Sequence, residues 1–135
     1  MSKDKYFHKS HCKYLLKCHL IFATKYRKKL LITFGNQIKQ SFQTIAQAYD
    51  FIINEIEVDK DHIHVLITFH PTQTLVEIVT KLKSISTKTL WAQNEVELKK
   101  TFWGKKRTFW SPSYFACTTG DASTEVIQQY IRSQG

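Results

Sequence analysis

Apolar and polar residues alternate in one segment near the start of the chain. Within residues 14–23 (YLLKCHLIFA), apolar side chains occupy every second position from Leu16 to Phe22, and Lys17 and His19 stand between them. Successive side chains of a strand point to opposite faces, so this pattern predicts a strand with one buried face.

A second and a third strand are predicted on either side of a short polar turn. Residues 51–58 and the segment from His62 to Phe69 are rich in apolar side chains. The Asp-Lys-Asp sequence at residues 59–61 is typical of a hairpin turn, and Pro71 ends the third strand. The face of the third strand that is expected to meet the helices consists of Ile63, Val65, Ile67 and Phe69.

Helical periodicity marks two segments. In the first, apolar residues recur at steps of four, three and four. In the second, Thr74 and Glu77 form a capping-box pattern in front of an apolar stripe. Both patterns predict amphipathic helices that pack on a sheet. The apolar positions are Ile38, Phe42, Ile45 and Tyr49 in the first helix, and Leu75, Ile78, Leu82 and Ile85 in the second.

The last third of the chain predicts a loop, a strand and a helix in that order. Residues 99–110 combine basic and aromatic side chains and are interpreted as a loop, and residues 113–119 predict a fourth strand. Gly120 ends this strand, and a final helix is expected over residues 122–134 with Ser123 as its cap.

The order strand, helix, strand, strand, helix, strand, helix predicts an α+β fold. It is typical of ferredoxin-like and RRM-like domains, in which helices cover one face of an antiparallel sheet; here a C-terminal helix follows. A chain of 135 residues, 42% of them hydrophobic, can form one core, so residues 1–135 are expected to be a single domain. No apolar run approaches the roughly 20 residues of a membrane span, and the N-terminus has no signal-peptide pattern. We therefore expect a cytoplasmic protein that does not bind membranes.

Basic residues are concentrated in two blocks. The formal net charge is +9; residues 1–34 hold nine basic residues and one acidic residue, and residues 81–110 hold eight and two. Interleaved aromatic side chains suit phosphate contacts together with base stacking, although an excess of charge can also serve solubility alone. The candidate DNA-binding residues are Tyr26, Arg27, Lys28, Lys29, Lys81, Lys88, Trp103, Lys105, Lys106 and Arg107.

The third strand carries two histidines on the face opposite its buried residues. His62 and His64 are two positions apart, so their side chains point the same way, about 7 Å apart. Two neighbouring imidazoles beside Asp61 form half of a divalent-metal site. The same spacing also occurs in ordinary exposed histidines, so it does not assign a metal by itself.

The final helix carries a possible nucleophile. Tyr130 and Gln134 are four positions apart and lie on the same face of the helix. A tyrosine hydroxyl can attack phosphate, and a glutamine carbonyl can complete a metal shell. Taken alone, Tyr130 could equally be a packing aromatic residue and Gln134 a solvated one.

These features occur together in one known family. The chain carries His62-Ile63-His64 after Asp61, a basic stretch KYRKK at residues 25–29, a strand sequence WSPSYF at residues 110–115, and a helix that ends in YIRSQ at residues 130–134. In this combination it resembles the single-tyrosine HUH transposases of the smallest bacterial and archaeal insertion sequences. The resemblance extends from about residue 14 to residue 134.

The resemblance implies a DNA transposase with a metal-dependent tyrosine mechanism. His62, His64 and Gln134 would hold Mg²⁺ or Mn²⁺, and Tyr130 would cleave single-stranded DNA through a 5′-phosphotyrosine and rejoin strands. The family recognises hairpins at the element ends and acts as a dimer. Because each chain offers one such tyrosine and Gly120 could serve as a hinge, we expect composite active sites, with histidines and tyrosine from different chains.

Three other functions share parts of this pattern. An RRM-like module would bind nucleic acid without catalysis, but such modules stack bases on aromatic residues of the central strands, where this chain has His62, His64 and Leu66. A nuclease with metal-activated water would need more carboxylates on that face. A domesticated HUH nuclease that processes hairpins cannot be separated from a transposase on these residues.

Overall fold

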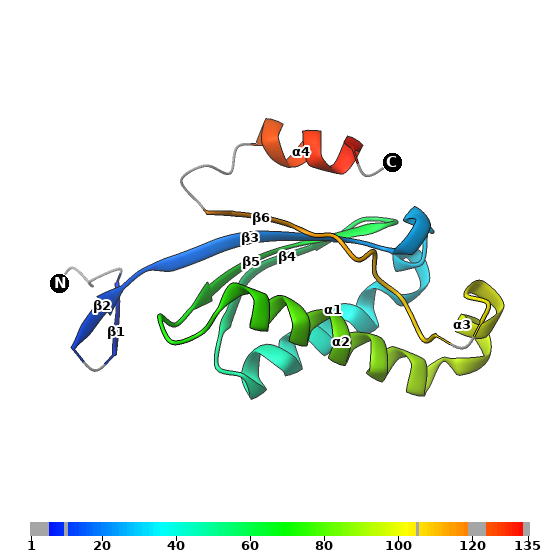
Figure 1. Cartoon of the computed structure of the whole chain (residues 1–135), viewed down its shortest axis with the longest axis horizontal. Coiled ribbons are helices and arrows are strands. Elements are labelled where there is room, and N and C mark those ends of the chain that lie inside the picture. The colour runs from blue at the N-terminus through cyan, green and yellow to red at the C-terminus, as the bar shows by residue number, and fades with distance from the viewer. Residues whose placement is uncertain (1–5, 10, 105, 119–123, 134–135) are drawn as a thin grey trace.

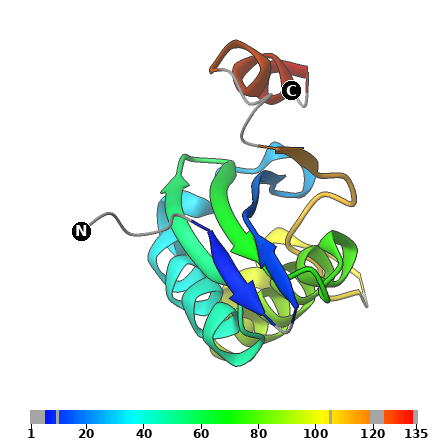
Figure 2. The same ribbon diagram turned by 90° about the vertical axis from the view of Figure 1, so that its left-hand side faces the viewer.

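The computed structural model shows a four-stranded antiparallel sheet between two unequal helical layers (Figure 1). Two long helices cover one face, and a short C-terminal helix lies on the other side of the sheet, as Figure 2 also shows. The structure describes residues 6–9, 11–104, 106–118 and 124–133. Among these residues, none of the helices combines the length and the apolar character that crossing a membrane requires.

The elements follow the predicted order with a short hairpin in front. They are β1 (Phe7–Lys9), β2 (Cys12–Tyr14), β3 (Leu16–Ala23), the 3-10 turn η1 (Lys25–Arg27), α1 (Leu31–Ala48), β4 (Ile52–Val58), β5 (His62–Phe69), α2 (Leu75–Gln93), α3 (Glu95–Thr101), β6 (Phe115–Thr118) and α4 (Thr124–Ser133).

The sheet has the order β4-β5-β3-β6, and every neighbouring pair is antiparallel. The first and third strands of the motif are therefore central, which confirms the ferredoxin-like prediction. The pairing of β3 with β5 sets Ile21 opposite His64 and Ala23 opposite His62. The hairpin β1-β2 forms a separate two-stranded sheet.

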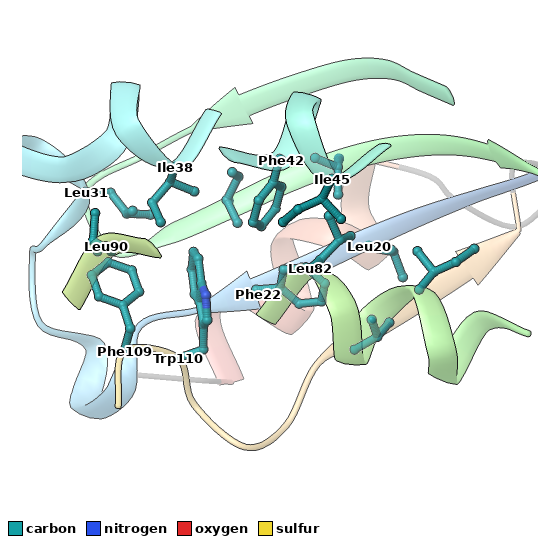
Figure 3. Close-up of a cluster of buried hydrophobic side chains, with 14 of the residues drawn as sticks. Leu20, Phe22, Leu31, Ile38, Phe42, Ile45, Leu82, Leu90, Phe109 and Trp110 are labelled. Atoms are coloured by element: carbon teal, nitrogen blue, oxygen red, sulfur yellow. The ribbon is translucent and has the colours of Figure 1, made fainter. Parts of the chain in front are cut away.

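The core lies between the sheet and the helices α1 and α2. Figure 3 shows its central side chains, which come from β3, from both helices and from the segment that precedes β6. Phe22, Phe42, Ile63 and Leu82 are fully buried. The hydroxyl of Thr74 accepts a hydrogen bond from the Glu77 amide at 3.2 Å, as the capping pattern predicts.

Element boundaries differ from the predictions in the last third of the chain. Part of the expected loop at residues 99–110 belongs to α3, which buries Leu98. Acidic residues in the first turn of α3 and lysines in its last turn complement the helix dipole. The aromatic and basic residues around this segment favoured a loop and hid that helical pattern. β6 covers 115–118 rather than 113–119, and α4 covers 124–133. The expected turn and cap at Gly120 and Ser123 lie outside the described residues.

Candidate functional site

Strand β5 has one apolar face and one polar face. Ile63, Val65 and Ile67 are fully buried toward α1 and α2, whereas His62 and His64 alternate with them and lie on the opposite face. We call this opposite surface of the sheet the open face. The side chains of both histidines are about one-seventh exposed (14% and 15%), so solvent and ligands can reach them. Both histidines thus lie on the face of β5 opposite its buried residues, as the alternation predicts.

Asp61 holds His62 on the open face. The Nδ1 atom of His62 lies 3.0 Å from Oδ1 of Asp61, and Nε of Arg27 donates to Oδ2 of the same carboxylate at 2.9 Å. Burial alone would raise the pKa of Asp61, but the hydrogen bonds and charges of Arg27 and His62 outweigh it and lower that pKa. Asp61 is thus a carboxylate at neutral pH, with one oxygen on each neighbour.

His64 has an imidazole partner from the adjacent strand. Nδ1 of His19 lies 2.7 Å from Nε2 of His64, and the two rings are stacked with centroids 4.9 Å apart. Burial and the neighbouring His19 lower the pKa of His64, so its imidazole is neutral near pH 7. Sequence reasoning placed His19 on this face but did not pair it with His64, because the pairing depends on the β3-β5 register.

The described residues supply part of a donor set for a divalent cation. A metal-binding histidine commonly gives its second ring nitrogen to a carboxylate, and the contact of His62 Nδ1 with Asp61 follows that pattern. Nε2 of His62 lies 4.0 Å from Asp59 Oδ2, and a metal bound at Nε2 of His64 would replace the contact with His19. Within the part of the chain that the structure describes, no three His, Cys, Asp or Glu side chains are placed to hold one metal ion. The third expected ligand, Gln134, lies outside the described residues.

Tyr130 packs on a residue of the cross-strand row that contains His64. The strand register places His64, Ile21 and Phe115 side by side across β5, β3 and β6. Two strand spacings of about 4.8 Å separate Phe115 from His64 by about 10 Å. The Tyr130 ring packs on Phe115 with centroids 4.9 Å apart. This contact places the tyrosine helix over β6, which is two strands away from β5 in the sheet.

The hydroxyl of Tyr130 is shielded from solvent. Burial raises its pKa, and the nearby hydroxyl of Ser113 and the charge of Arg27 offset part of that rise. The phenol is therefore protonated at neutral pH and must lose its proton when it reacts.

Two basic segments that are far apart in the sequence meet in one groove. The groove has a volume of about 670 Å³, and two of its aromatic residues, Tyr26 (76%) and Trp103 (89%), are highly exposed. Cations beside two exposed aromatic rings are the arrangement that binds single-stranded nucleic acid. The lining residues are Lys25, Tyr26, Lys28, Lys100, Thr101, Phe102, Trp103, Lys106 and Thr108.

The turn η1 at the edge of this groove contains strained backbone. Tyr26 and Arg27 have φ values of 59° and 52°, a left-handed conformation that costs about 1–2 kcal/mol per non-glycine residue. Tyr26 thereby lines the groove, whereas Arg27 is not among the lining residues and contacts Asp61 instead. Strain of this kind persists only where the surrounding structure holds it.

Four further candidate DNA-binding residues, Lys29, Lys81, Lys88 and Arg107, lie outside the groove lining. Lys29 is exposed, and Lys81 packs over the Tyr49 ring at 4.4 Å. Lys88 and Arg107 line a second cavity of about 530 Å³ along α2, where Arg107 Nη2 also donates to Glu95 at 2.7 Å. Lys105 lies outside the described residues.

Comparison with known proteins gives a consistent result. Residues 12–134 match the family model described as "Transposase IS200 like". The chain is 32% identical to the ISDra2 transposase TnpA of Deinococcus radiodurans over 122 residues, which are 90% of this chain and 85% of that protein. It is 30% identical over 128 residues to the transposase for insertion sequence element IS200 of Salmonella typhimurium, with 93% and 80% covered.

Two solved structures have the same fold. A crystal structure of a transposase from Deinococcus radiodurans superimposes with a TM-score of 0.81 at 30% identity, covering 99% of this chain and 98% of that one. A REP-associated tyrosine transposase, solved bound to a REP hairpin, superimposes with a TM-score of 0.57 at 15% identity, covering 97% and 68%.

Proposed function

This chain belongs to the IS200-like transposase family, and on that premise we propose that it cuts and rejoins single-stranded DNA through Tyr130. The observation that carries the proposal is the position of Tyr130 over the open face, packed on Phe115 in the row that contains His64. Packing alone would account for Tyr130, but it would not account for the two histidines on the same face of the sheet.

The reaction at Tyr130 is a phosphoryl transfer. The phenolic Oη attacks a backbone phosphorus, an Oη–P bond forms, and the bond from phosphorus to the 3′ oxygen of the preceding nucleotide breaks. The tyrosine proton is lost and the departing 3′ oxygen takes up a proton, which leaves a 5′-phosphotyrosine and a free 3′-OH. Attack by the 3′-OH of another strand reverses these steps and joins the two strands without ATP.

We propose that His62, His64 and Gln134 hold Mg²⁺ or Mn²⁺ beside this phosphate. When bound, the cation supplies Lewis-acid neutralisation of charge on the phosphate and the leaving oxygen. Three features of this chain prepare the ligands: Asp61 orients the His62 ring, burial keeps His64 neutral, and the open face admits solvent.

The groove at η1 is the proposed binding surface for the DNA. Its lysines would contact phosphates, and Tyr26 and Trp103 would stack on unpaired bases. That a protein of the same fold was solved with a REP hairpin supports a hairpin as the bound form. We expect the hairpins to lie near the ends of the mobile element.

A dimer with exchanged helices is a further part of the proposal. In the single chain, α4 lies over its own sheet, and exchange between two copies would give two composite sites. Mixing Tyr130→Phe protein with His64→Ala protein tests this: composite sites predict that some cleavage returns, with the adduct on the His64→Ala chain. An adduct confined to chains with their own intact histidines would contradict the exchange.

The proposed function is tested with single-stranded oligonucleotides that tile the DNA on both sides of the gene. Wild-type protein with Mg²⁺ or Mn²⁺ is expected to form a covalent adduct with an oligonucleotide that contains a hairpin. Tyr130→Phe should bind that oligonucleotide with unchanged affinity and form no adduct. Tyr49→Phe, at a half-exposed tyrosine that ends α1, is the matched control and should react normally. Binding without any adduct in the wild type would favour an RRM-like binding module instead.

A further inference from the structure

Arg27 stands between the DNA-binding groove and the open face. It follows the groove residues Lys25 and Tyr26 in the same three-residue turn. Its side chain is only 22% exposed and contacts Asp61 at the start of β5. The left-handed backbone at both Tyr26 and Arg27 produces this opposite orientation of neighbouring side chains. The strained turn thus directs the Arg27 guanidinium away from the groove that Lys25 and Tyr26 line.

The guanidinium of Arg27 joins two parts of the proposed active site. Its Nε donates to Oδ2 of Asp61 at 2.9 Å, and Oδ1 of Asp61 contacts His62. Its Nη1 donates to the backbone carbonyl of Ile131 at 2.7 Å. Ile131 directly follows Tyr130, so one side chain holds the residue beside the nucleophile and the residue beside the metal-ligand histidine.

The contact with α4 has a clear physical basis. The Ile131 carbonyl lies in the last described turn of α4, and a cation near the C-terminal part of a helix is favoured by the helix dipole. The neighbouring Tyr130 carbonyl accepts from Ser133 Oγ at 2.8 Å. Arg27 therefore supplies, from a distant element, a hydrogen-bond donor to a carbonyl of α4.

We propose that Arg27 is a positioning residue that fixes α4, and with it Tyr130, relative to the Asp61–His62 pair. In a dimer with exchanged helices, Arg27 would hold the α4 of the other chain through the same hydrogen bond. The inference rests on the proposed function of Tyr130. A guanidinium presents several N–H groups in a rigid fork and can donate to two acceptors in fixed directions, which a lysine ammonium on a flexible stem cannot match. Arg27→Lys keeps the charge but loses this two-ended geometry.

The experiment compares Arg27→Lys with Arg132→Lys, the same substitution at an exposed arginine on α4 itself. For each protein we measure the affinity for the reactive hairpin oligonucleotide, the single-turnover rate of adduct formation at saturating DNA, and amide hydrogen exchange in α4 and α1. Arg27→Lys is expected to slow adduct formation about 10- to 100-fold, because a misplaced nucleophile reacts poorly, while hairpin affinity changes less than about twofold.

Hydrogen exchange provides an independent readout that needs neither DNA nor metal. Faster exchange in α4 with unchanged exchange in α1 is expected for Arg27→Lys, and no change for Arg132→Lys. A double variant with Asp61→Asn should lose less than the product of the single effects, since both act in one network.

The outcomes separate this inference from the proposed function. An Arg27→Lys protein with wild-type adduct rate and wild-type exchange in α4 would overturn the positioning role, as would equal losses of rate and affinity. If wild-type protein forms no adduct, the proposed function fails, and the exchange in α4 still decides whether Arg27 holds the helix.

Discussion

The two faces of the central sheet differ in what their residues do, although the same strands supply both. Toward α1 and α2, β5 contributes Ile63, Val65 and Ile67, all fully buried. Toward α4 it contributes His62 and His64, which keep part of their surface in solvent and contact Asp61 and His19. Along β5, residues that stabilise the fold alternate with residues proposed to act in the reaction. Substitutions at neighbouring positions should therefore affect different properties, stability at one and activity at the next.

The largest expected effect is on the open face and concerns activity. His64→Ala, or removal of divalent metal by a chelator, should reduce adduct formation by about a hundredfold or more, because a metal contributes several kcal/mol to phosphoryl transfer. Hairpin affinity should stay within about twofold, since binding depends on the groove. A parallel loss of affinity in His64→Ala would break the comparison, because it would assign the histidine to DNA contact or to folding.

We call the face of the sheet that packs on α1 and α2 the covered face. Substitutions there should lower the stability of the protein. Phe22 is fully buried against Phe42 and Trp110, so Phe22→Ala should lower the free energy of unfolding by about 3–5 kcal/mol. Denaturant titration measures this loss, and Ile32→Ala, at a residue 66% exposed on α1, is the control with a change below about 0.5 kcal/mol. A core in which Phe22→Ala costs no more than Ile32→Ala would contradict the packing described for that face.

Substitutions in the groove should lower the affinity for DNA. Trp103→Ala is expected to weaken hairpin binding by about 1–3 kcal/mol through the loss of one stacking contact. Val96→Ala, also highly exposed but outside the groove lining, should leave binding unchanged. The affinity of wild-type protein should also fall steeply between about 50 and 200 mM salt. Binding that does not depend on salt would be incompatible with the electrostatic account.

The smallest effect concerns the strained turn. At residue 26 the backbone is left-handed, a conformation that asparagine tolerates and β-branched residues do not. Tyr26→Asn should therefore be more stable than Tyr26→Val by about 1 kcal/mol, as measured by thermal or denaturant unfolding. Equal stabilities would show that the turn changes conformation freely and does not fix the direction of Arg27.

The covered face could be predicted from the sequence because its signals are local. The alternation along His62–Phe69 and the helical steps from Ile38 to Ile45 each lie within a few residues, and a capping hydroxyl at Thr74 marks where α2 begins. Hydrophobic periodicity reports these features directly. The helix α3 was not predicted, because its short amphipathic pattern lies between aromatic and basic residues that favour a loop.

The open face could be predicted only in part because its contacts join distant residues. The motif His62-Ile63-His64 and Tyr130 are visible in the sequence. The contact of His19 with His64 depends on strand register, and the contact of Arg27 with Ile131 spans more than one hundred residues. Arg27 was predicted to bind DNA with its neighbours; in the structure its guanidinium contacts Asp61, and both Tyr26 and Arg27 have left-handed backbone. Local pattern contains no signal for either contact.

The central claim is that Tyr130 on the open face is the nucleophile, and peptide mapping of the covalent complex tests it most directly. Trypsin cleavage after Arg107 and Arg132 gives a peptide of residues 108–132 that contains two tyrosines, Tyr114 and Tyr130. After reaction with the hairpin oligonucleotide and nuclease digestion, fragmentation of this peptide should place a 5′-linked nucleotide on Tyr130. A nucleotide on Tyr114 or on another residue, or an unmodified peptide from a reaction that has cut the DNA, would contradict the account.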